Sequence, residues 1–543
     1  MDQSKRRDDP FKDLPPEMSF EIFSYLNKES FLVTRRVSKN WKFLADSSRK
    51  LSFTCDLTDA TISTVVNSKE VISCVRIHDF LGGSKHVVSG TRGIGRVLSA
   101  ADSIQLIGRS INGAEVGKMM KFAAGSLKEI WFQGCHSSLI RPMFNFGKPF
   151  ECLRKLTISF NILPTHQEAH FLQTLSSPFV APQLRTLEHL KVIYELVEHE
   201  AVVNYPSAEE IFSNYMALAH LLLRYGTSLK NVEIVRNDEV RNAIIDHVKT
   251  EALQFSEVQL DELQECEEGL REIQLDSYHT NVLGDEGEFP WILEMSLLQS
   301  QNNLKELFFE NERCFIDQIP HQPFPFLLSN NPEHLTKINM SLSISPGHEP
   351  INLAAFSQCP VLKVLWLEFY LGVSTGVQTI NYIGFENLEQ LPKTIKSFHL
   401  KPRHEDTYSI HHLTRDQVRW IAANLKGLES IWLQLFLTIP AVDQVGAESH
   451  SNFDVPTFME LTSGLALKDF NFDILKVVQF GNRLEVGVDN NLNPLVFMEL
   501  ISLEDVREYV RICEGKYGRI VVNRNEEDRV RRVRIAVAAT NRN

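Results

Sequence analysis

The sequence lacks a long hydrophobic run. In 543 residues, no stretch approaches the roughly 18 apolar residues that a membrane helix needs, so we expect no membrane span. The first residues, MDQSKRRDDPFKDLPPE, carry charge without an apolar core, and we expect no secretory signal. Basic residues are in the minority, since 56 Lys and Arg stand against 69 Asp and Glu, for a formal net charge of −13. This balance argues against nucleic-acid binding, which needs a basic surface.

The eight cysteines lack the close spacing of a metal or redox site. None forms a C-x-x-C pair, which disfavours zinc fingers, zinc ribbons and thioredoxin-type sites. Without a secretory signal, all eight are expected to be reduced thiols in a cytoplasmic or nuclear protein. The chain also has no G-x-S-x-G or P-loop sequence, and no cysteine lies in a local motif of a catalytic nucleophile. We therefore predict no catalytic residue, no metal ligand and no cofactor.

Two further motifs suggest a nucleotide-binding loop and a metal site, but their residue spacing does not match either. Gly90, Gly93 and Gly95 resemble the nucleotide loop of short-chain dehydrogenases, yet their spacing is G-x-x-G-x-G and no Y-x-x-x-K pair follows. The histidines within residues 404–412 fit no standard set of metal ligands, and a solvated loop explains them better. A dehydrogenase is kept as an alternative that depends on the glycine string alone.

Residues 11–50 predict three short helices. Leu14 and Pro15 open the first, because proline near the first helical turn loses no needed hydrogen bond. Apolar residues at helical spacing follow, and Ser38 can cap a third helix that carries Trp41. Three short helices in about 40 residues cannot enclose a full core. Such a segment should leave apolar side chains that need a partner.

This segment resembles the F-box. The residues that carry the resemblance are Leu14, Pro15, Glu17, Ile22, Leu26, Leu32, Val37, Ser38, Trp41 and Leu44. The resemblance implies docking onto a Skp-type adaptor, and through it onto a cullin–RING ubiquitin ligase. The residues expected to contact the adaptor are Leu14, Pro15, Pro16, Glu17, Ile22, Leu26, Leu32, Val37 and Trp41. The alternative is a generic helical cap on a repeat array.

From residue 70 onward, one pattern returns: an apolar residue, two others, an apolar residue, one other, and a third apolar residue. Its copies begin at Ile72, Ala101, Leu127, Leu153, Leu187, Leu229, Leu270, Leu304, Leu335, Leu362, Ile395, Leu428 and Leu467. The average separation, about 33 residues, slightly exceeds the usual 20–29 of leucine-rich repeats. Helical stretches between the copies begin with capping-box spacing at Ser207 and Thr414. The chain thus resembles an irregular leucine-rich repeat solenoid, and a non-solenoid α/β fold is the alternative.

Each copy of the pattern should present one residue on the concave face of the sheet, at the position before its last apolar residue. These residues are Arg76, Gln105, Trp131, Thr157, Lys191, Glu233, Gln274, Phe308, Asn339, Trp366, His399, Trp432 and Asn471. Three of the six tryptophans fall in this series, and exposed aromatic residues are typical interaction anchors. The alternative is that tryptophan simply favours strands.

We predict a protein substrate contacted by Trp131, Phe308, Trp366 and Trp432. Residues 250–290 contain twelve acidic residues and one basic residue, which favours a basic substrate segment nearby. Glu306 and Glu310 are the expected selectors of that basic flank. A solvated acidic insertion is the alternative explanation of these charges.

The predicted fold class is α/β, with a small three-helix F-box followed by an irregular leucine-rich repeat solenoid of about 13 strand–helix units. The expected divisions are a disordered start at 1–10, an F-box at 11–50, repeats at 51–480, a capping region at 481–522 and a basic tail at 523–543. The tail is read as either a nuclear address or a disordered end. This architecture resembles substrate receptors of SCF ubiquitin ligases, which implies a non-enzymatic adaptor. The alternative is a repeat scaffold with no ubiquitin-ligase role.

Overall fold

The chain forms two compact units of mixed α/β structure. Unit 1 contains residues 1–229 and 233–256, and unit 2 contains residues 230–232 and 257–543. The computed structural model describes residues 18, 37, 41, 53–57, 72–78, 101–109, 111–160, 166–195, 207–237, 257–282, 291–311, 332–344, 350–371, 381–402, 409–440, 454–479, 496–499, 503–517, 520–524 and 532–537. Both units combine parallel strands with helices that pack on them, which confirms the α/β class.

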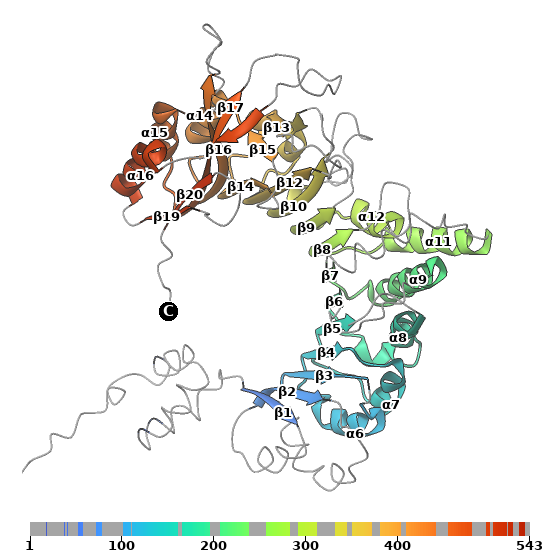
Figure 1. The fold of residues 1–543 in the computed structure, drawn as a ribbon. Helices are drawn as coiled ribbons and strands as arrows, with labels where there is room; N and C mark the ends of the chain where they lie inside the picture. Colours follow the sequence, from blue (N-terminus) through green and yellow to red (C-terminus); the bar gives the residue numbers. More distant parts are fainter. Residues whose placement is uncertain are drawn as a thin grey trace, which may run out of the picture. The chain divides into compact units, whose positions relative to one another are not determined.

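Unit 1 is built on a run of parallel strands in chain order. These are β1 (Phe53–Leu57), β2 (Ile72–His78), β3 (Ser103–Ile107), β4 (Glu129–Gln133), β5 (Lys155–Phe160) and β6 (His189–Tyr194). The connecting helices are α6 (Gly113–Ala123), η2 (Ser137–Leu139), α7 (Ile140–Phe144), α8 (His166–Ser176), η3 (Ala181–Leu184) and α9 (Ala208–Tyr225). Figure 1 shows α6 to α9 on one side of these strands. Strand β7 (Asn231–Arg236) follows, and the division between the units falls inside it.

Unit 2 contains a longer parallel run and a second, smaller sheet. The long run consists of β8 (Ser277–Val282), β9 (Glu306–Asn311), β10 (Lys337–Ile344), β12 (Val364–Leu371), β14 (Ser397–Pro402), β16 (Ser430–Pro440) and β17 (Asp469–Gln479). The small parallel sheet consists of β11 (Ile351–Asn352), β13 (Asn381–Glu386) and β15 (Ser409–His412). Helices and 3-10 turns connect the strands: α11 (Glu257–Leu270), α12 (Trp291–Gln299), η5 (Pro332–His334), η6 (Ala354–Gln358), η7 (Leu388–Gln390), α14 (Arg415–Asn424) and α15 (Val455–Gly464).

Unit 2 ends its parallel run with antiparallel strands. Strand β17 pairs with β18 (Val496–Glu499) and with β20 (Arg532–Val537), and β20 also pairs with β19 (Ile520–Arg524). Helix α16 (Leu503–Tyr517), expected from its amphipathic pattern, lies next to α15. Its Lys516 Nζ donates to the Leu465 carbonyl at 2.7 Å. Part of the basic C-terminal segment is therefore a strand of the sheet.

The recurring apolar pattern explains why the helices cover one face of each sheet. Successive strand residues point to opposite faces, so the second and third apolar positions of one copy share a face. In unit 1, Leu156 and Ile158 are fully buried, and in unit 2 Leu365 and Leu367 are fully buried. We call the other face, which carries the residue between these two positions, the open face. The open face is where the sequence places its candidate anchors.

The two predicted capping boxes are confirmed. Ser207 Oγ accepts from the Glu210 amide at 3.2 Å, and Glu210 Oε2 accepts from the Ser207 amide at 2.9 Å. Thr414 and Gln417 make the same reciprocal pair at the start of α14. Because each box satisfies two backbone amides that the helix leaves unpaired, it fixes the residue at which the helix starts.

Close helix packing is visible at glycines in both units. A Cβ at Gly117 of α6 would lie 2.5 Å from the Pro142 carbonyl oxygen of α7. A Cβ at Gly464 of α15 would lie 2.8 Å from the Ala422 carbonyl oxygen of α14. Both approaches involve backbone atoms, which cannot rotate out of the way. The helix-covered layers of the two units are thus packed in a similar manner.

One strand prediction is wrong. The sequence pattern at Leu270 predicted a strand over 270–275, but Leu270 is the last residue of α11 and the strand there is Ser277–Val282. Leu270 is buried as part of the apolar stripe of that helix, and the strand buries Tyr278 and Thr280 instead. The residue at the open-face position is consequently His279, which is in register with Phe308. Gln274 lies before the strand and donates to the Ser300 carbonyl.

Candidate functional site

The open face of unit 2 carries a row of aromatic and amide side chains. Strand register aligns Phe308, Asn339, Trp366, His399 and Trp432 across β9, β10, β12, β14 and β16. Neighbouring strands are about 4.8 Å apart, so each of the three large aromatic residues lies two strands, or roughly 10 Å, from the next. Phe308 also contacts the ring of His279, with centroids 4.1 Å apart. The sequence placed Phe308, Trp366 and Trp432 in this row correctly.

Trp366, His399 and Trp432 form the centre of the row. The Trp366 and His399 rings stack with centroids 4.6 Å apart and planes inclined by 6°. The His399 and Trp432 rings are tilted, at 6.3 Å and 55°. His399 is 7% exposed, whereas both tryptophans are half-buried and still reach the surface. The histidine therefore acts as a buried spacer between two accessible indoles.

A chain of hydrogen bonds fixes this cluster. Trp366 Nε1 donates to Ser397 Oγ at 2.8 Å. The Ser430 hydroxyl donates to Asp469 Oδ2 at 3.1 Å, so Ser430 Oγ is left to accept from His399 Nε2 at 2.8 Å. The neutral ring of His399 thus carries its proton on Nε2.

Burial keeps His399 neutral. It lowers the pKa of His399 to about 4, an effect that the nearby Asp469 opposes and Lys401 reinforces. At pH 7 the ring can therefore stack and donate without introducing a charge beneath the two indoles.

The same hydrogen bonds do not form a hydrolase triad. In a triad, the hydroxyl and the carboxylate lie at opposite ring nitrogens of the histidine. Here Ser397 Oγ and Ser430 Oγ lie at 3.3 and 2.8 Å from the same nitrogen, Nε2, and Asp469 contacts Ser430. These contacts hold a surface in place and do not position His399 to activate either serine.

Charged groups lie beside the aromatic row. Lys401 forms an ion pair with Glu368 and also places its Nζ 5.3 Å from the centroid of the Trp432 ring. Trp432 Nε1 donates to Asp473 Oδ2 at 3.3 Å. Glu310 shares the open face with Phe308, two residues earlier on β9. Carboxylates therefore accompany the aromatic rings along the row.

Both predicted acidic selectors lie on β9, and Glu306 forms an ion pair. Its carboxylate lies 3.6 Å from Lys337 Nζ. Glu310 lies four residues further along β9, beyond Phe308 on the same face, and is in register with Ser341 and, through it, with Glu368. Sequence reasoning did not identify Glu368, Lys401 or His399 as site residues. Their positions could have identified them, because each lies either two residues along its strand from an aromatic ring of the same face or beside such a ring on the neighbouring strand.

Trp131 belongs to unit 1, whereas the other three predicted anchors belong to unit 2. Trp131 is in register with Gln105 on β3 and with Thr157 on β5. Around it the open face is polar, because Gln105 accepts from Arg76 at 2.9 Å and donates to Gln133 at 3.0 Å. Trp131 is half-buried and stands in this polar surface without a second aromatic residue in its row.

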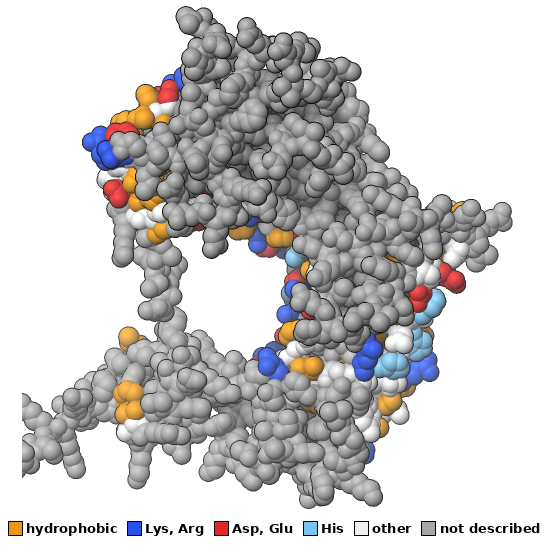
Figure 2. Space-filling model, viewed as in Figure 1, with side chains coloured by type: hydrophobic (Ala, Val, Ile, Leu, Met, Phe, Trp, Pro, Cys, Tyr) orange, Lys and Arg blue, Asp and Glu red, His pale blue; other side chains and the backbone are white. Residues whose placement is uncertain are grey.

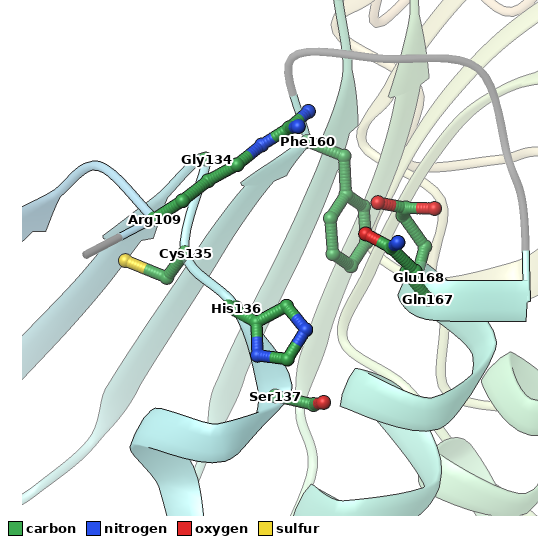
Figure 3. A pocket seen from close by; sticks show the side chains of 8 residues that line it. All are labelled: Arg109, Gly134, Cys135, His136, Ser137, Phe160, Gln167 and Glu168. Carbon is green, nitrogen blue, oxygen red and sulfur yellow. The ribbon is translucent and has the colours of Figure 1, made fainter. Parts of the chain in front are cut away.

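Unit 1 also contains a pocket at the ends of β3, β4 and β5 (Figure 3). It is lined by Arg109, Gly134, Cys135, His136, Ser137, Phe160, Gln167 and Glu168. The Cys135 sulfur points away from Glu168 in Figure 3 and lies 3.3 Å from the Leu106 carbonyl oxygen. His136 Nδ1 accepts from the Ser138 amide at 3.2 Å. The thiol and the imidazole are thus engaged with separate partners.

Other side chains with catalytic potential are buried or dispersed. Burial raises the pKa of Cys359 and of Cys513 to about 12, and that of Cys266 to about 11, so these thiols are poor nucleophiles. Across the described ranges, no three His, Cys, Asp or Glu side chains come close enough to hold a metal ion. None of the described helices combines the length and apolar character needed to cross a membrane.

The predicted adaptor-binding residues are mostly outside the described residues. Only Val37 and Trp41 are described: Val37 is 57% exposed, and Trp41 is half-buried. The residues outside are Leu14, Pro15, Pro16, Glu17, Ile22, Leu26 and Leu32. The candidate loop at Gly90, Gly93 and Gly95 also lies outside.

Comparison with known proteins identifies one domain. The family model of the F-box domain matches residues 11–53, which supports an F-box protein. The search of curated proteins found no match to this chain. The matched segment covers the region in which the sequence indicated an adaptor-docking unit.

Proposed function

We propose that this chain is the substrate-recognition subunit of an SCF-type cullin–RING ubiquitin ligase. The observation that carries this proposal is the F-box match at residues 11–53, since F-box domains in general bind a Skp-type adaptor. The protein contributes proximity and orientation, while partner proteins perform the chemistry of ubiquitin transfer. It is a non-enzymatic protein of the cytoplasm or nucleus.

The substrate is a protein held on the open face by irregular leucine-rich repeat units. Support for this part comes from the row of Phe308, Trp366 and Trp432, whose rings lie on one face at regular two-strand intervals. Large aromatic residues in a polar surround are typical of interaction anchors. Figure 2 shows hydrophobic, charged and histidine side chains interspersed where described residues reach the surface in this view.

Co-purification with the adaptor tests the ligase assignment. Replacing Leu14 and Pro15 with alanine should abolish adaptor binding, because the F-box resemblance places both at the docking surface. Trp366→Ala in the full chain is the matched control, and it should leave adaptor binding unchanged. Equal adaptor recovery from the Leu14→Ala/Pro15→Ala variant and the unaltered chain would reject the assignment. The protein would then be a repeat scaffold without a ligase role.

A further inference from the structure

The indoles of the two open faces differ in how their nitrogen atoms are held. In unit 2, Trp366 Nε1 donates to Ser397 Oγ at 2.8 Å, and Trp432 Nε1 donates to Asp473 Oδ2 at 3.3 Å. In unit 1, Trp131 Nε1 is buried and makes no hydrogen bond within the part of the chain that the structure describes. The indoles of unit 2 thus have a restraint that Trp131 lacks.

A row of small polar residues runs beside the aromatic row of unit 2. Ser397, Ser430 and Asp469 are in register on β14, β16 and β17, two residues before the aromatic row on each strand. Residues two apart on a strand share a face, so these hydroxyl and carboxylate groups lie on the open face. They are therefore placed to hydrogen-bond with the ring nitrogens of the neighbouring row.

Asp469 sets the direction of the hydrogen bonds in this polar row. An ionised carboxylate can only accept, so the Ser430 hydroxyl donates to Asp469 Oδ2 at 3.1 Å. Ser430 Oγ then accepts from His399 Nε2 at 2.8 Å, which fixes the tautomer and the orientation of the imidazole. A carboxylate on β17 thus determines how a ring is held on β14, two strands away.

The imidazole of His399 in turn supports Trp366 on β12. The two rings stack with their planes inclined by 6°, and His399 is 7% exposed, whereas Trp366 still reaches the surface. The indole is held by this stack and, separately, by its hydrogen bond to Ser397. An anchor that is ordered before it binds loses less conformational entropy on binding. The contacts of Trp366 therefore favour tight capture of a partner.

We propose that His399 is a positioning residue for substrate capture, which transmits the restraint from Asp469 and Ser430 to Trp366 and so holds that indole in its binding orientation. This inference rests on the proposed function, because it assigns a role in the capture of a substrate protein. Since His399 is buried, it acts through Trp366 and does not itself touch the substrate.

Fluorine NMR of the full chain, labelled with 5-fluorotryptophan, tests the positioning. The six tryptophans give six resonances, and Trp366→Phe and Trp131→Phe each assign one of them. Ser430→Ala removes the acceptor of His399 and changes no ring. We expect it to shift or broaden the Trp366 resonance and to leave the Trp131 resonance in place. The matched control, Ser430→Thr, restores a hydroxyl and should return the Trp366 resonance toward its original position.

An unmoved Trp366 resonance in folded Ser430→Ala protein overturns the proposal, because the restraint would not pass through Ser430. If Ser430→Ala does not fold, as judged by its thermal unfolding, Asp469→Ala replaces it. That variant removes the carboxylate that directs the Ser430 hydroxyl, and the same change of the Trp366 resonance is expected. A purely structural role of His399 would lower stability without a selective change at Trp366.

Substrate capture is measured on the same variants. The probe is the set of proteins that the unaltered chain recovers from cells with the proteasome inhibited and that the Trp366→Ala/Trp432→Ala variant does not recover. Ser430→Ala should lower recovery of this set about threefold or more, and Ser430→Thr should restore it. Unchanged recovery despite a moved Trp366 resonance overturns the proposal. An empty set overturns both the aromatic anchors and the positioning role.

Adaptor co-purification from the same preparations separates this inference from the ligase assignment. Adaptor binding without the expected loss of capture in Ser430→Ala rejects the positioning role alone. The expected NMR change and loss of capture, without adaptor binding by the unaltered chain, reject the ligase assignment and leave the role of His399 standing.

Discussion

The open faces of the two units differ although the strands beneath them are built on the same apolar pattern. In unit 1 the face is covered by paired polar groups, such as Lys191 with Glu233 at 2.6 Å and Lys155 with Glu129 at 3.0 Å. In unit 2 the corresponding row is aromatic and is centred on the neutral, buried His399. The apolar positions determine the fold, so the residues between them are free to diverge. Function is therefore sought in the residues between the apolar positions.

The largest expected effect concerns the aromatic anchors. Trp366→Ala combined with Trp432→Ala should reduce capture of the substrate protein by at least roughly thirtyfold, since an anchor residue of an interface contributes about 2 kcal/mol or more. Trp131→Ala, in the polar face of unit 1, should leave the affinity unchanged. The measurement is the amount of protein captured from cells with the proteasome inhibited, on variants whose circular dichroism is unaltered. Equal losses in both units would remove the distinction between the faces.

The second effect is a pH dependence that only the face of unit 2 should show. The pKa of His399 is lowered to about 4 from an ordinary 6.5, so the unfolded chain binds a proton that the folded chain excludes. Stability should therefore fall as the pH drops from about 6.5 to 4, by roughly 3 kcal/mol at most. His399→Gln keeps a donor toward Ser430 but does not titrate. Denaturant unfolding of both proteins across this range should show a steeper decline for the unaltered chain, and parallel curves would contradict the prediction.

The third effect concerns the helix-covered layers, which should respond alike. Gly117→Ala in unit 1 and Gly464→Ala in unit 2 each force a methyl group against a backbone carbonyl. Each should lower the stability of its unit by about 1–3 kcal/mol, as overpacking does. Gly125→Ala and Gly427→Ala are the controls, since nothing lies within 4 Å of a Cβ at either position. Thermal unfolding monitors all four, and controls as unstable as the test variants would show that the close approach is not the cause.

The smallest effect is expected from the ion pairs of unit 1. Lys191 and Glu233 are about one-third exposed, so Lys191→Met should change stability by only about 0–1 kcal/mol. The change should shrink further in high salt, because screening already weakens the pair. Unfolding at low and high salt gives the comparison. A loss of several kcal/mol would show that the polar face of unit 1 is also a tightly coupled structure.

Much of the strand layout could be predicted because the apolar pattern is local. Leu365 and Leu367 occupy the buried positions that the pattern assigned to them. The pattern failed at Leu270 because a helix can bury the same leucine and the next strand can use Tyr278. The small sheet of β11, β13 and β15 was not predicted, since its strands are two to six residues long and have no repeated apolar spacing.

For the candidate site, only the positions of residues within each single strand could be predicted. Trp366 and Trp432 follow from their position between apolar residues. The stacking of Trp366 on His399, and the contact of Lys401 with Trp432, depend on the register between strands 31 to 33 residues apart. Loop lengths set that register, and the sequence pattern does not state it. The ion pair of Glu306 with Lys337 could not be predicted for the same reason, because Lys337 lies on the next strand.

The pairing of β20 with β17 has a consequence for shortened forms of this protein. Residues 532–536 are the strand partners of Asn471 to Leu475. A stop codon or a protease cut before residue 532 would leave those amides and carbonyls as an exposed edge, ready to recruit a strand from another molecule. Strand β20 therefore protects the solubility of the protein, and forms cut before residue 532 should accumulate as aggregates rather than as soluble protein.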